Sequence, residues 1–402
     1  MRVVFLSPTY PPEMRQFTRG LAEVGAEVLG VGDGQPDGEL KRYLSDYLQV
    51  PSIMDEDDVI ARVHAWLRGR TVDHVLANWE PLVITAARMR ERFGLPGMSA
   101  DVVRGFRDKQ LMKERVAAAG LRVARARRVR TAAEARAAVE HTGLPAIIKP
   151  ISGAGSADTY KLESMADLEK VLPALGHVIE ASCEEFITGD EYTYDALCVD
   201  GEPRYENVTR YLPNALEMRS HEWVSPIMLS VRDLAQPHLQ PGLTLGRQVM
   251  KALGMGDGMV HMEWFLTPSG EAVFGEIACR PGGACIVDQI NYTSDIDIFR
   301  EWARISTTGR FDASTERKYN VGIIFKRAQG HGTITNIVGL RRYLERYGAG
   351  VVEDNLLRPG TPRRDWKSTL LSDGYLIIRH PDWDTACEMS FAAATDIKMY
   401  AS

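Results

Sequence analysis

The chain has 402 residues, of which 45% are hydrophobic and 25% charged, so its composition is that of a globular protein and excludes a disordered, collagenous or coiled-coil chain. At ~150 residues per domain, this length predicts about three domains. Lys and Arg number 48 against 54 Asp and Glu, and the net charge of −6 provides no overall positive field for nucleic acid or anionic lipid. Small molecules are therefore the expected partners.

The cysteine content and the apolar runs indicate a cytoplasmic protein. The five cysteines have no CxxC or paired spacing, which argues against a disulfide framework or a structural zinc site. About five apolar residues precede Ser7 and Pro8, too few for the apolar region of a signal peptide. No window approaches the ~18 apolar residues of a membrane span, so we expect no membrane role.

Residues 1–98 alternate short β-rich runs with helical patterns, which predicts βαβ units on a parallel sheet. The expected strands are Arg2–Leu6, Val28–Val31 and Val75–Ala77, and the expected helices are Arg15–Val24, Val59–Leu67 and Leu82–Phe93. The turn after the first strand lacks GxGxxG, which disfavours a nicotinamide-binding Rossmann site.

Residues 99–190 predict a helix from Ser99 to Ala119 and then a second α/β region. Its expected elements are a helix at Ala132–His141, a strand at Ala146–Lys149, a helix at Met165–Leu172 and a strand ending at Ile187. Residues 191–402 predict strands at Glu191–Val199 and Arg204–Tyr211, a helix at Leu243–Leu253, and an α/β lobe over the last ~90 residues. The polar stretch 213–226 is longer than a plain connector, as binding loops often are.

The segment 259–283, MVHMEWFLTPSGEAVFGEIACRPGG, predicts a β-hairpin around a Pro-Ser-Gly turn. With Ser269 and Gly270 as the two loop residues, Glu263 and Glu276 stand directly opposite each other, with Cβ atoms ~4.5–5.5 Å apart. Like charges so placed need a cation or a shared proton, and Mg²⁺ takes carboxylate oxygens together with water and phosphates. The alternative is the solvated outer face of a hairpin.

Three upstream segments are consistent with nucleotide binding. Lys149 ends an apolar strand before a loop of small residues, whose backbone N–H groups can cradle phosphates, although an ordinary flexible loop is the alternative. The acidic turn Glu184–Glu191 can present backbone groups of Glu185 and Ile187 to an adenine edge. Lys109, taken alone, would be a surface lysine on a helix.

The order of these parts resembles the ATP-grasp superfamily over about residues 70–310: helical DK, a strand ending in lysine, a small-residue loop, EEFITGDE, a glutamate and, thirteen residues later, ExxxR. The resemblance implies an α/β (α+β) ATP-grasp fold. Its expected parts are an N-terminal parallel-sheet pre-ATP-grasp domain (1–98), linker helices with a lid lobe (99–190), and a catalytic lobe with a C-terminal α/β extension (191–402). The segments EIACRPGGACIV and GHGTITNIVGL look most like carboxylate–amine ligases of the L-amino-acid ligase type.

The resemblance also implies roles for individual residues. Glu263 and Glu276 would bind two Mg²⁺ ions, with Mn²⁺ as a substitute, and Arg280 would steady an acyl phosphate and act in catalysis with Lys149. Many family members have an Asn ligand where this chain has Ala278, which leaves the second metal with fewer protein ligands. The residues implied to contact ATP are Lys109, Lys149, Gly153, Ala154, Gly155, Ser156, Glu184, Glu185, Phe186, Ile187 and Glu191.

The expected reaction is ATP-dependent joining of a carboxylate, such as an amino acid or a related small acid, to an amine through an acyl phosphate, with release of ADP and phosphate. Two alternatives remain: an ATP-dependent carboxylase of the biotin-carboxylase or purine-pathway type, and a non-catalytic nucleotide-binding protein. The resemblance alone suggests a homodimer. The candidate substrate residues are Glu80, Arg210, His221, Glu222, Gly282, Gly283 and His331, with His221 and Glu222 also candidate bases. Trp79 and Trp264 are expected to be core residues.

Overall fold

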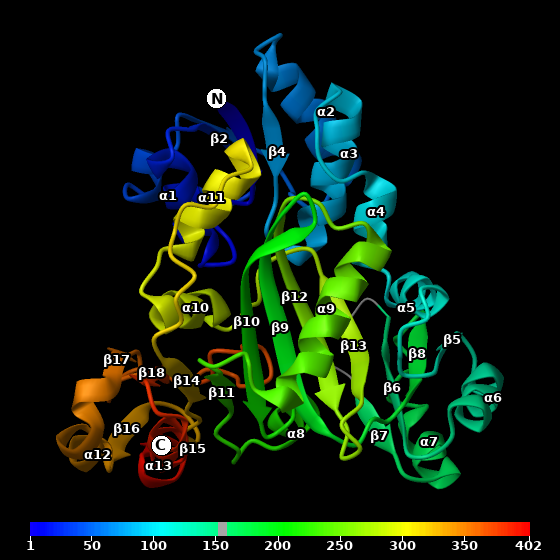
Figure 1. Cartoon of the computed structure of the whole chain (residues 1–402), viewed down its shortest axis with the longest axis vertical. Coiled ribbons are helices and arrows are strands. Elements are labelled where there is room, and N and C mark those ends of the chain that lie inside the picture. The colour runs from blue at the N-terminus through cyan, green and yellow to red at the C-terminus, as the bar shows by residue number, and fades with distance from the viewer. Residues whose placement is uncertain (152–158) are drawn as a thin grey trace.

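The computed structural model describes residues 1–151 and 159–402. Its N-terminal sheet is parallel with strand order β3-β2-β1-β4, as the alternating pattern predicted. The strands are β1 (Arg2–Leu6), β2 (Glu27–Gly32), β3 (Asp46–Gln49) and β4 (His74–Leu76), and the helices are α1 (Met14–Glu23), α2 (Glu56–Leu67) and α3 (Val83–Phe93). This sheet forms one end of the molecule, at the top of Figure 1.

Two short helices follow where one was predicted: α4 (Ala100–Gly105) and α5 (Lys109–Ala118). The break has a local cause, because the Asp108 side chain accepts hydrogen bonds from the backbone N–H groups of Gln110 (2.9 Å) and Leu111 (3.1 Å) and so begins a new helix. The prediction of a single helix was wrong, and the cap places Lys109 in the first turn of α5.

A four-stranded antiparallel sheet, called the lid sheet here, has the order β5-β8-β6-β7. Its strands are β5 (Ala126–Val129), β6 (Ala146–Pro150), β7 (Tyr160–Leu162) and β8 (Ala181–Glu185), and its helices are α6 (Ala132–Thr142) and α7 (Met165–Val171). The sheet and its two helices form a core of their own. Strand β8 ends two residues before the predicted Ile187.

The large sheet has eight antiparallel strands in the order β13-β12-β9-β10-β11-β14-β18-β17. Its strands are β9 (Asp190–Val199), β10 (Glu202–Leu212), β11 (Ile227–Ser230), β12 (Gly258–Leu266), β13 (Ala272–Ala278), β14 (Asn320–Phe325), β17 (Val351–Asp354) and β18 (Tyr375–His380). The helices that follow them include α8 (Ala215–Ser220), α9 (Gln240–Leu253), α10 (Ile286–Ser294) and α11 (Ile298–Thr308). Helix α8 lies in the stretch predicted to be irregular.

The core beneath β12 explains why Trp264 does not face a ligand. Its indole is fully buried and stacks on Tyr192, with ring centroids 4.9 Å apart. Helix α9 crosses this indole at Gly242, where a Cβ atom would lie 2.1 Å from the ring. The prediction that Trp264 is a core residue is confirmed.

The C-terminal segments extend the large sheet and add a small one. Strands β14, β18 and β17 continue the large sheet, and the small sheet has the order β15-β19-β16. Its strands are β15 (Gln329–Gly330), β16 (Ile334–Val338) and β19 (Lys398–Ala401), accompanied by α12 (Leu340–Tyr347) and α13 (Trp383–Asp396).

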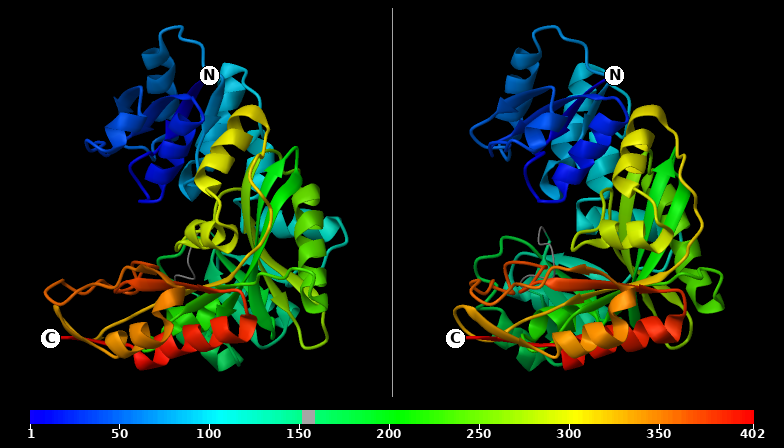
Figure 2. Two further views of the ribbon diagram at one scale, coloured as in Figure 1. Left: turned by 60° about the vertical axis from the view of Figure 1, so that its left-hand side comes forward. Right: turned by 90° about the vertical axis from the view of Figure 1, so that its left-hand side faces the viewer.

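The N-terminal sheet is docked on the large-sheet region through α1 and α11, which run side by side in both views of Figure 2. Phe17 of α1 meets Phe299 and Trp302 of α11 edge-on, with ring centroids 4.9 Å apart in each pair. Gly20 permits this approach, because a Cβ atom there would lie 2.5 Å from the Phe299 carbonyl oxygen. The two regions are therefore held together by close backbone packing.

Candidate active site

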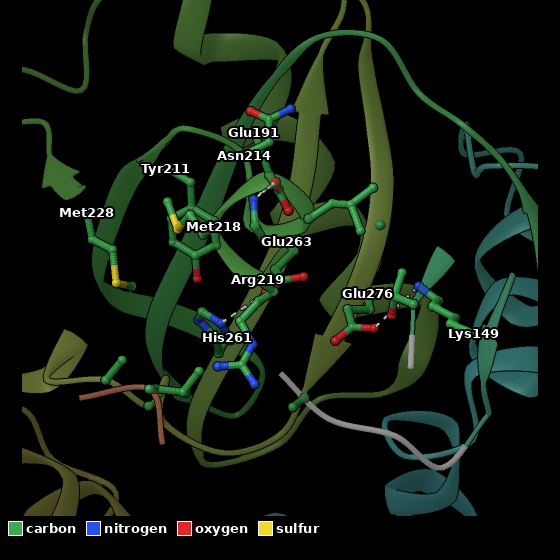
Figure 3. Close-up of a pocket in the computed structure, with 18 of the residues that line it drawn as sticks. Lys149, Glu191, Tyr211, Asn214, Met218, Arg219, Met228, His261, Glu263 and Glu276 are labelled. Atoms are coloured by element: carbon green, nitrogen blue, oxygen red, sulfur yellow. Dashed lines mark hydrogen bonds and ion pairs between the residues drawn. The ribbon is translucent and has the colours of Figure 1, made fainter. Parts of the chain in front are cut away.

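One cavity of about 1030 Å³ lies where the N-terminal sheet, the lid sheet and the large sheet meet. The N-terminal sheet contributes Glu80 from the segment after β4, the lid sheet contributes Lys149, and the large sheet contributes Glu263 and Glu276. Figure 3 shows that the last three side chains face the same space. A cavity of this size is at the upper end of the usual range for small-molecule sites.

The predicted carboxylate pair is confirmed: Glu263 of β12 is paired in register with Glu276 of β13. The assumed two-residue loop was wrong, because the pairing beside the turn is offset by one residue, with Leu266 opposite Ala272. A bulge at Gly275 restores the register before the pair is reached. A Cβ atom at Gly275 would lie 2.8 Å from the Glu263 carbonyl oxygen, so this bulge requires glycine.

Three lysines and Glu184 form a buried ion-pair network beside this pair. Lys109 contacts the Glu276 carboxylate, and Lys149 lies 3.1 Å from Glu184 and 3.9 Å from Glu276. The third lysine, Lys113, lies 2.5 Å from Glu184, and burial lowers its pKa to about 8. Glu184 was expected at adenine, whereas its side chain binds Lys113 and Lys149.

Sequence reasoning missed Lys113. It stands four residues after Lys109 on α5, so helical spacing places both amino groups on one face of the helix. That spacing was the available signal.

The carboxylates differ in their need for a cation. Burial disfavours the charged form of Glu276, but Lys109 and Lys149 outweigh it and lower the pKa of that carboxyl. Burial and repulsion by Glu276 raise the pKa of Glu263. Glu191 accepts a hydrogen bond from the Ala215 backbone N–H (2.6 Å), and burial together with Glu263 raises its pKa to about 8. Glu276 is therefore neutralised by lysines, whereas Glu191 and Glu263 lack enough positive charge beside them.

This deficit fits a divalent cation. Among the described residues, no group of three or more His, Cys, Asp or Glu side chains could hold a metal by itself. Mg²⁺ is commonly bound by one or two carboxylates, with water and phosphate oxygens as its other ligands, and Glu263 and Glu276 supply such a pair. The side chain of Ala278 offers no further ligand.

Arg280 is oriented by a residue from the N-terminal region. Its Nε donates to Glu80 Oε2 (2.5 Å), and its Nη1 donates to the Pro281 carbonyl oxygen (2.7 Å). Arg107 lies 3.6 Å from the other oxygen of Glu80. Glu80 was expected to contact a substrate, but in this structure it holds the arginine that was expected to steady the acyl phosphate.

The segment after β8 gives the cavity an apolar recess. Ile187 packs with Ala124, Val273 and Phe265, and Phe186 also lines the cavity. The Glu185 backbone N–H donates to the Arg125 carbonyl oxygen (2.8 Å), and the contact of residues 184–187 with adenine stays a prediction. The Glu185 carboxylate is bound by Arg122 (2.9 Å) and Arg125 (3.2 Å).

The predicted phosphate loop, Gly153, Ala154, Gly155 and Ser156, lies outside the described residues.

The predicted substrate residues fall into two groups. Glu80, His221 and Gly283 line the cavity. The other four are not among its lining residues. Arg210 pairs with Asp190 (2.6 Å), Glu222 pairs with Arg363 (2.8 Å), Gly282 packs against His261 and Ile286, and His331 is exposed beside β15.

The cavity also contains residues that sequence reasoning missed. His261 lies two residues before Glu263 on β12 and therefore on the same face of the strand. Its Nδ1 is 2.7 Å from Asp195, which raises the pKa of the imidazole against the opposing effect of burial. Strand alternation could have identified His261. Arg219 and Arg327 come from connecting segments without such a pattern.

Comparisons with known proteins identify the fold. Residues 142–288 match the family model described as the ATP-grasp domain. The L-amino acid ligase of Bacillus licheniformis has the same fold over 100% of this chain and 99% of its own, with a TM-score of 0.80 at 16% identity. N5-carboxyaminoimidazole ribonucleotide synthetase of Thermotoga maritima aligns over the same shares, with a TM-score of 0.71 at 16% identity.

Residues 142–288 thus match an ATP-grasp domain, and the whole chain shares its fold with these two enzymes. Among curated relatives, the L-arginine-specific L-amino acid ligase of Bacillus subtilis is 28% identical over 241 residues, which are 58% of this chain and 57% of that protein. Alanine–anticapsin ligase of Bacillus subtilis is 22% identical over 60% of this chain and 56% of its own. The chain spans little more than half the length of these relatives. Over part of its length it is similar to these amino acid ligases, the type that its motifs resembled.

The helices in the described part of the chain include none that is both long and apolar enough to cross a membrane.

Proposed function

We propose that this protein is an ADP-forming carbon–nitrogen ligase that activates a small carboxylate with ATP and joins it to an amine. The observation that carries the proposal is the juxtaposition of Glu263 and Glu276 with Lys109, Lys149 and Arg280 around one buried cavity. Phosphoryl transfer requires mainly positioning and charge neutralisation, and these groups supply both. We also propose that the chain consists of three parts, residues 1–98, 99–190 and 191–402. The N-terminal sheet lies in the first part and the lid sheet in the second.

In the first step, the substrate carboxylate attacks the terminal phosphorus of ATP, the bond from that phosphorus to the bridging oxygen breaks, and ADP leaves an acyl phosphate behind. We propose that Lys109 and Lys149 exchange their contacts with Glu276 for phosphate oxygens, which leaves both glutamates free to hold Mg²⁺. The metal, when bound, neutralises charge on the phosphates. The apolar recess around Phe186 and Ile187 is suited to the adenine.

In the second step, the amine attacks the acyl phosphate and phosphate leaves. The guanidinium of Arg280 can bind oxygens of the acyl phosphate and offset the charge at the tetrahedral carbon. Glu80 acts as its positioning residue, because the 2.5 Å contact fixes the direction of the guanidinium. His261 and His221 both line the cavity and are candidates to take the proton of the amine.

The carboxylase alternative has support in the fold, because carboxyaminoimidazole ribonucleotide synthetases and a biotin carboxylase align over nearly the whole chain. At 15–16% identity these likenesses concern the fold alone. In that reaction bicarbonate would replace the organic acid, so the two functions differ in the acid that is required for release of ADP.

The test is ADP release from ATP and Mg²⁺ with amino acids supplied in pairs, followed by mass analysis of the product. The proposed function predicts ADP, phosphate and an amide in equal amounts, and no product from Arg280→Ala. ADP release that requires bicarbonate would favour the carboxylase. ATP binding without turnover across a broad panel of acids, amines and bicarbonate would favour a non-catalytic nucleotide-binding protein.

A further inference from the structure

Two arginines line the side of the cavity formed by the C-terminal segments. Arg219 belongs to α8, and Arg327 follows β14. Arg327 donates to the His221 carbonyl oxygen (2.8 Å) and to Ser372 Oγ (3.3 Å), while Arg219 donates to the Trp366 carbonyl oxygen (3.0 Å). Neutral acceptors therefore hold both guanidiniums in place.

The described carboxylates act on these two arginines only at a distance, Asp365 on Arg219 and Glu222 and Asp373 on Arg327. Within residues 1–151 and 159–402, neither guanidinium has a carboxylate partner at ion-pair distance. The acidic groups that influence Arg327, Glu222 and Asp373, are already bound by Arg363 at 2.8 and 3.2 Å. Burial and repulsion by Arg219 lower the pKa of Arg327 to about 10, as expected for a cation without a close counter-charge.

Arg327 is separated from the carboxylate pair along the large sheet. In the large sheet β14 lies five strands from β13, which carries Glu276. Neighbouring strands are ~4.8 Å apart, so the two strands are separated by roughly 24 Å across the sheet. The wall between them includes Tyr211, Met228 and Phe325. Arg327 thus lies beyond this stretch of wall as seen from the site proposed for phosphate, whereas Arg219 belongs to α8, which begins at Ala215 beside Glu191.

We propose that Arg219 and Arg327 form a binding site for a carboxylate that is not activated in the reaction and that is carried by one of the two substrates. Calling the ligand a substrate rests on the proposed function, but the anion site itself does not. Guanidinium groups pair with carboxylates in a planar, bidentate arrangement and keep their charge at all physiological pH values. The apolar wall beside them suits a ligand whose carboxylate adjoins an apolar part.

The ligand chemistry has two sources, and paired probes distinguish them. The carboxylate can belong to the amine substrate, which L-leucine and L-leucinamide test, since they differ in that group. It can also be the second carboxylate of the acid, which L-glutamate and L-glutamine test in the same way. Calorimetry measures each dissociation constant with the full chain saturated with Mg²⁺ and a non-hydrolysable ATP analogue.

The carboxylate-bearing member of at least one pair should bind about ten-fold more tightly than its amide, as expected for losing a hydrogen bond between charged groups. Arg219→Gln should abolish that preference, and Arg327→Lys should weaken it while retaining the charge. Both variants should bind the ATP analogue as the wild type does. Arg247→Gln is the matched control, because Arg247 is an exposed arginine of α9 that pairs with Glu206 (2.6 Å) outside the cavity.

Equal binding of acid and amide in both pairs, or no binding of any of the four compounds, would overturn the site. A loss of affinity for the ATP analogue in Arg219→Gln would overturn it as well, by assigning this arginine to the nucleotide. The two proposals can fail separately: carboxylate-selective binding without ADP release from any acid and amine would retain the anion site and refute the ligase.

Discussion

Replacing Gly275 by alanine tests whether the bulge on β13 maintains the carboxylate pair. The new Cβ atom would lie 2.8 Å from the Glu263 carbonyl oxygen, a distance that side chains do not tolerate, so the two strands must separate by about half an ångström. Forced contacts of this kind cost about 1–3 kcal/mol. The displaced atom belongs to Glu263 itself, so we expect both a lower free energy of unfolding and weaker Mg²⁺ activation.

The measurements are urea unfolding and the Mg²⁺ concentration for half-maximal ADP release. Gly270→Ala in the turn of the same hairpin is the control. Gly270 has φ +82°, and a Cβ atom added there would have no neighbouring atom within 4 Å, so its substitution costs about 1 kcal/mol through backbone strain alone. Its Mg²⁺ dependence should stay that of the wild type. The reasoning is refuted if Gly275→Ala keeps wild-type stability and Mg²⁺ dependence.

Three further predictions concern charged groups. Arg280→Lys should lower amide formation at least ten-fold, because the bidentate guanidinium is lost, while affinity for ATP stays within about two-fold. Product mass measures the first effect and nucleotide titration the second. Normal product formation would contradict the role of Arg280. Lys113→Met should lower the free energy of unfolding by about 3 kcal/mol in urea titrations, because Glu184 is left with one lysine fewer in a buried site, and an unchanged midpoint would show that Lys149 suffices. Burial and then Glu353 raise the pKa of Asp288 to about 7, so the folded state binds more protons than the unfolded state between about pH 4 and 7 and stability falls as pH rises through this window. Asp288→Asn should therefore raise the free energy of unfolding on the order of 2 kcal/mol at pH 8 and by little at pH 4, and a parallel pH profile for both proteins would disprove the assignment.

The carboxylate pair shows how far sequence reasoning can reach. Alternation along two short strands identified Glu263 and Glu276 as neighbours, and that pairing is confirmed. The assumed loop was nevertheless wrong by one residue, and the bulge at Gly275 compensates for the error. A bulge depends on contacts between strands, so neither alternation nor turn chemistry reveals it.

Local patterns also predicted most of the strands and helices, because hydrophobic periodicity depends on neighbours in the chain. They failed where distant segments decide the outcome. Arg219 and Arg327 are brought together through the His221 carbonyl oxygen, to which Arg327 donates across 106 positions of sequence. Their segments carry no repeating pattern, so their meeting could not be predicted from sequence alone.

The contact between Glu80 and Arg280 joins residues 200 positions apart and makes the reaction centre dependent on docking of the N-terminal sheet. The packing of α1 on α11 provides that docking, with Gly20 against Phe299 and an ion pair between Arg19 and Asp297 (2.9 Å). A chain whose N-terminal sheet has come loose keeps both lysines and the carboxylate pair but loses the partner that directs Arg280. Under the proposed function, such a partly folded chain would keep the groups assigned to ATP but lack the directed guanidinium of the second step, so amide formation would require the docked N-terminal sheet.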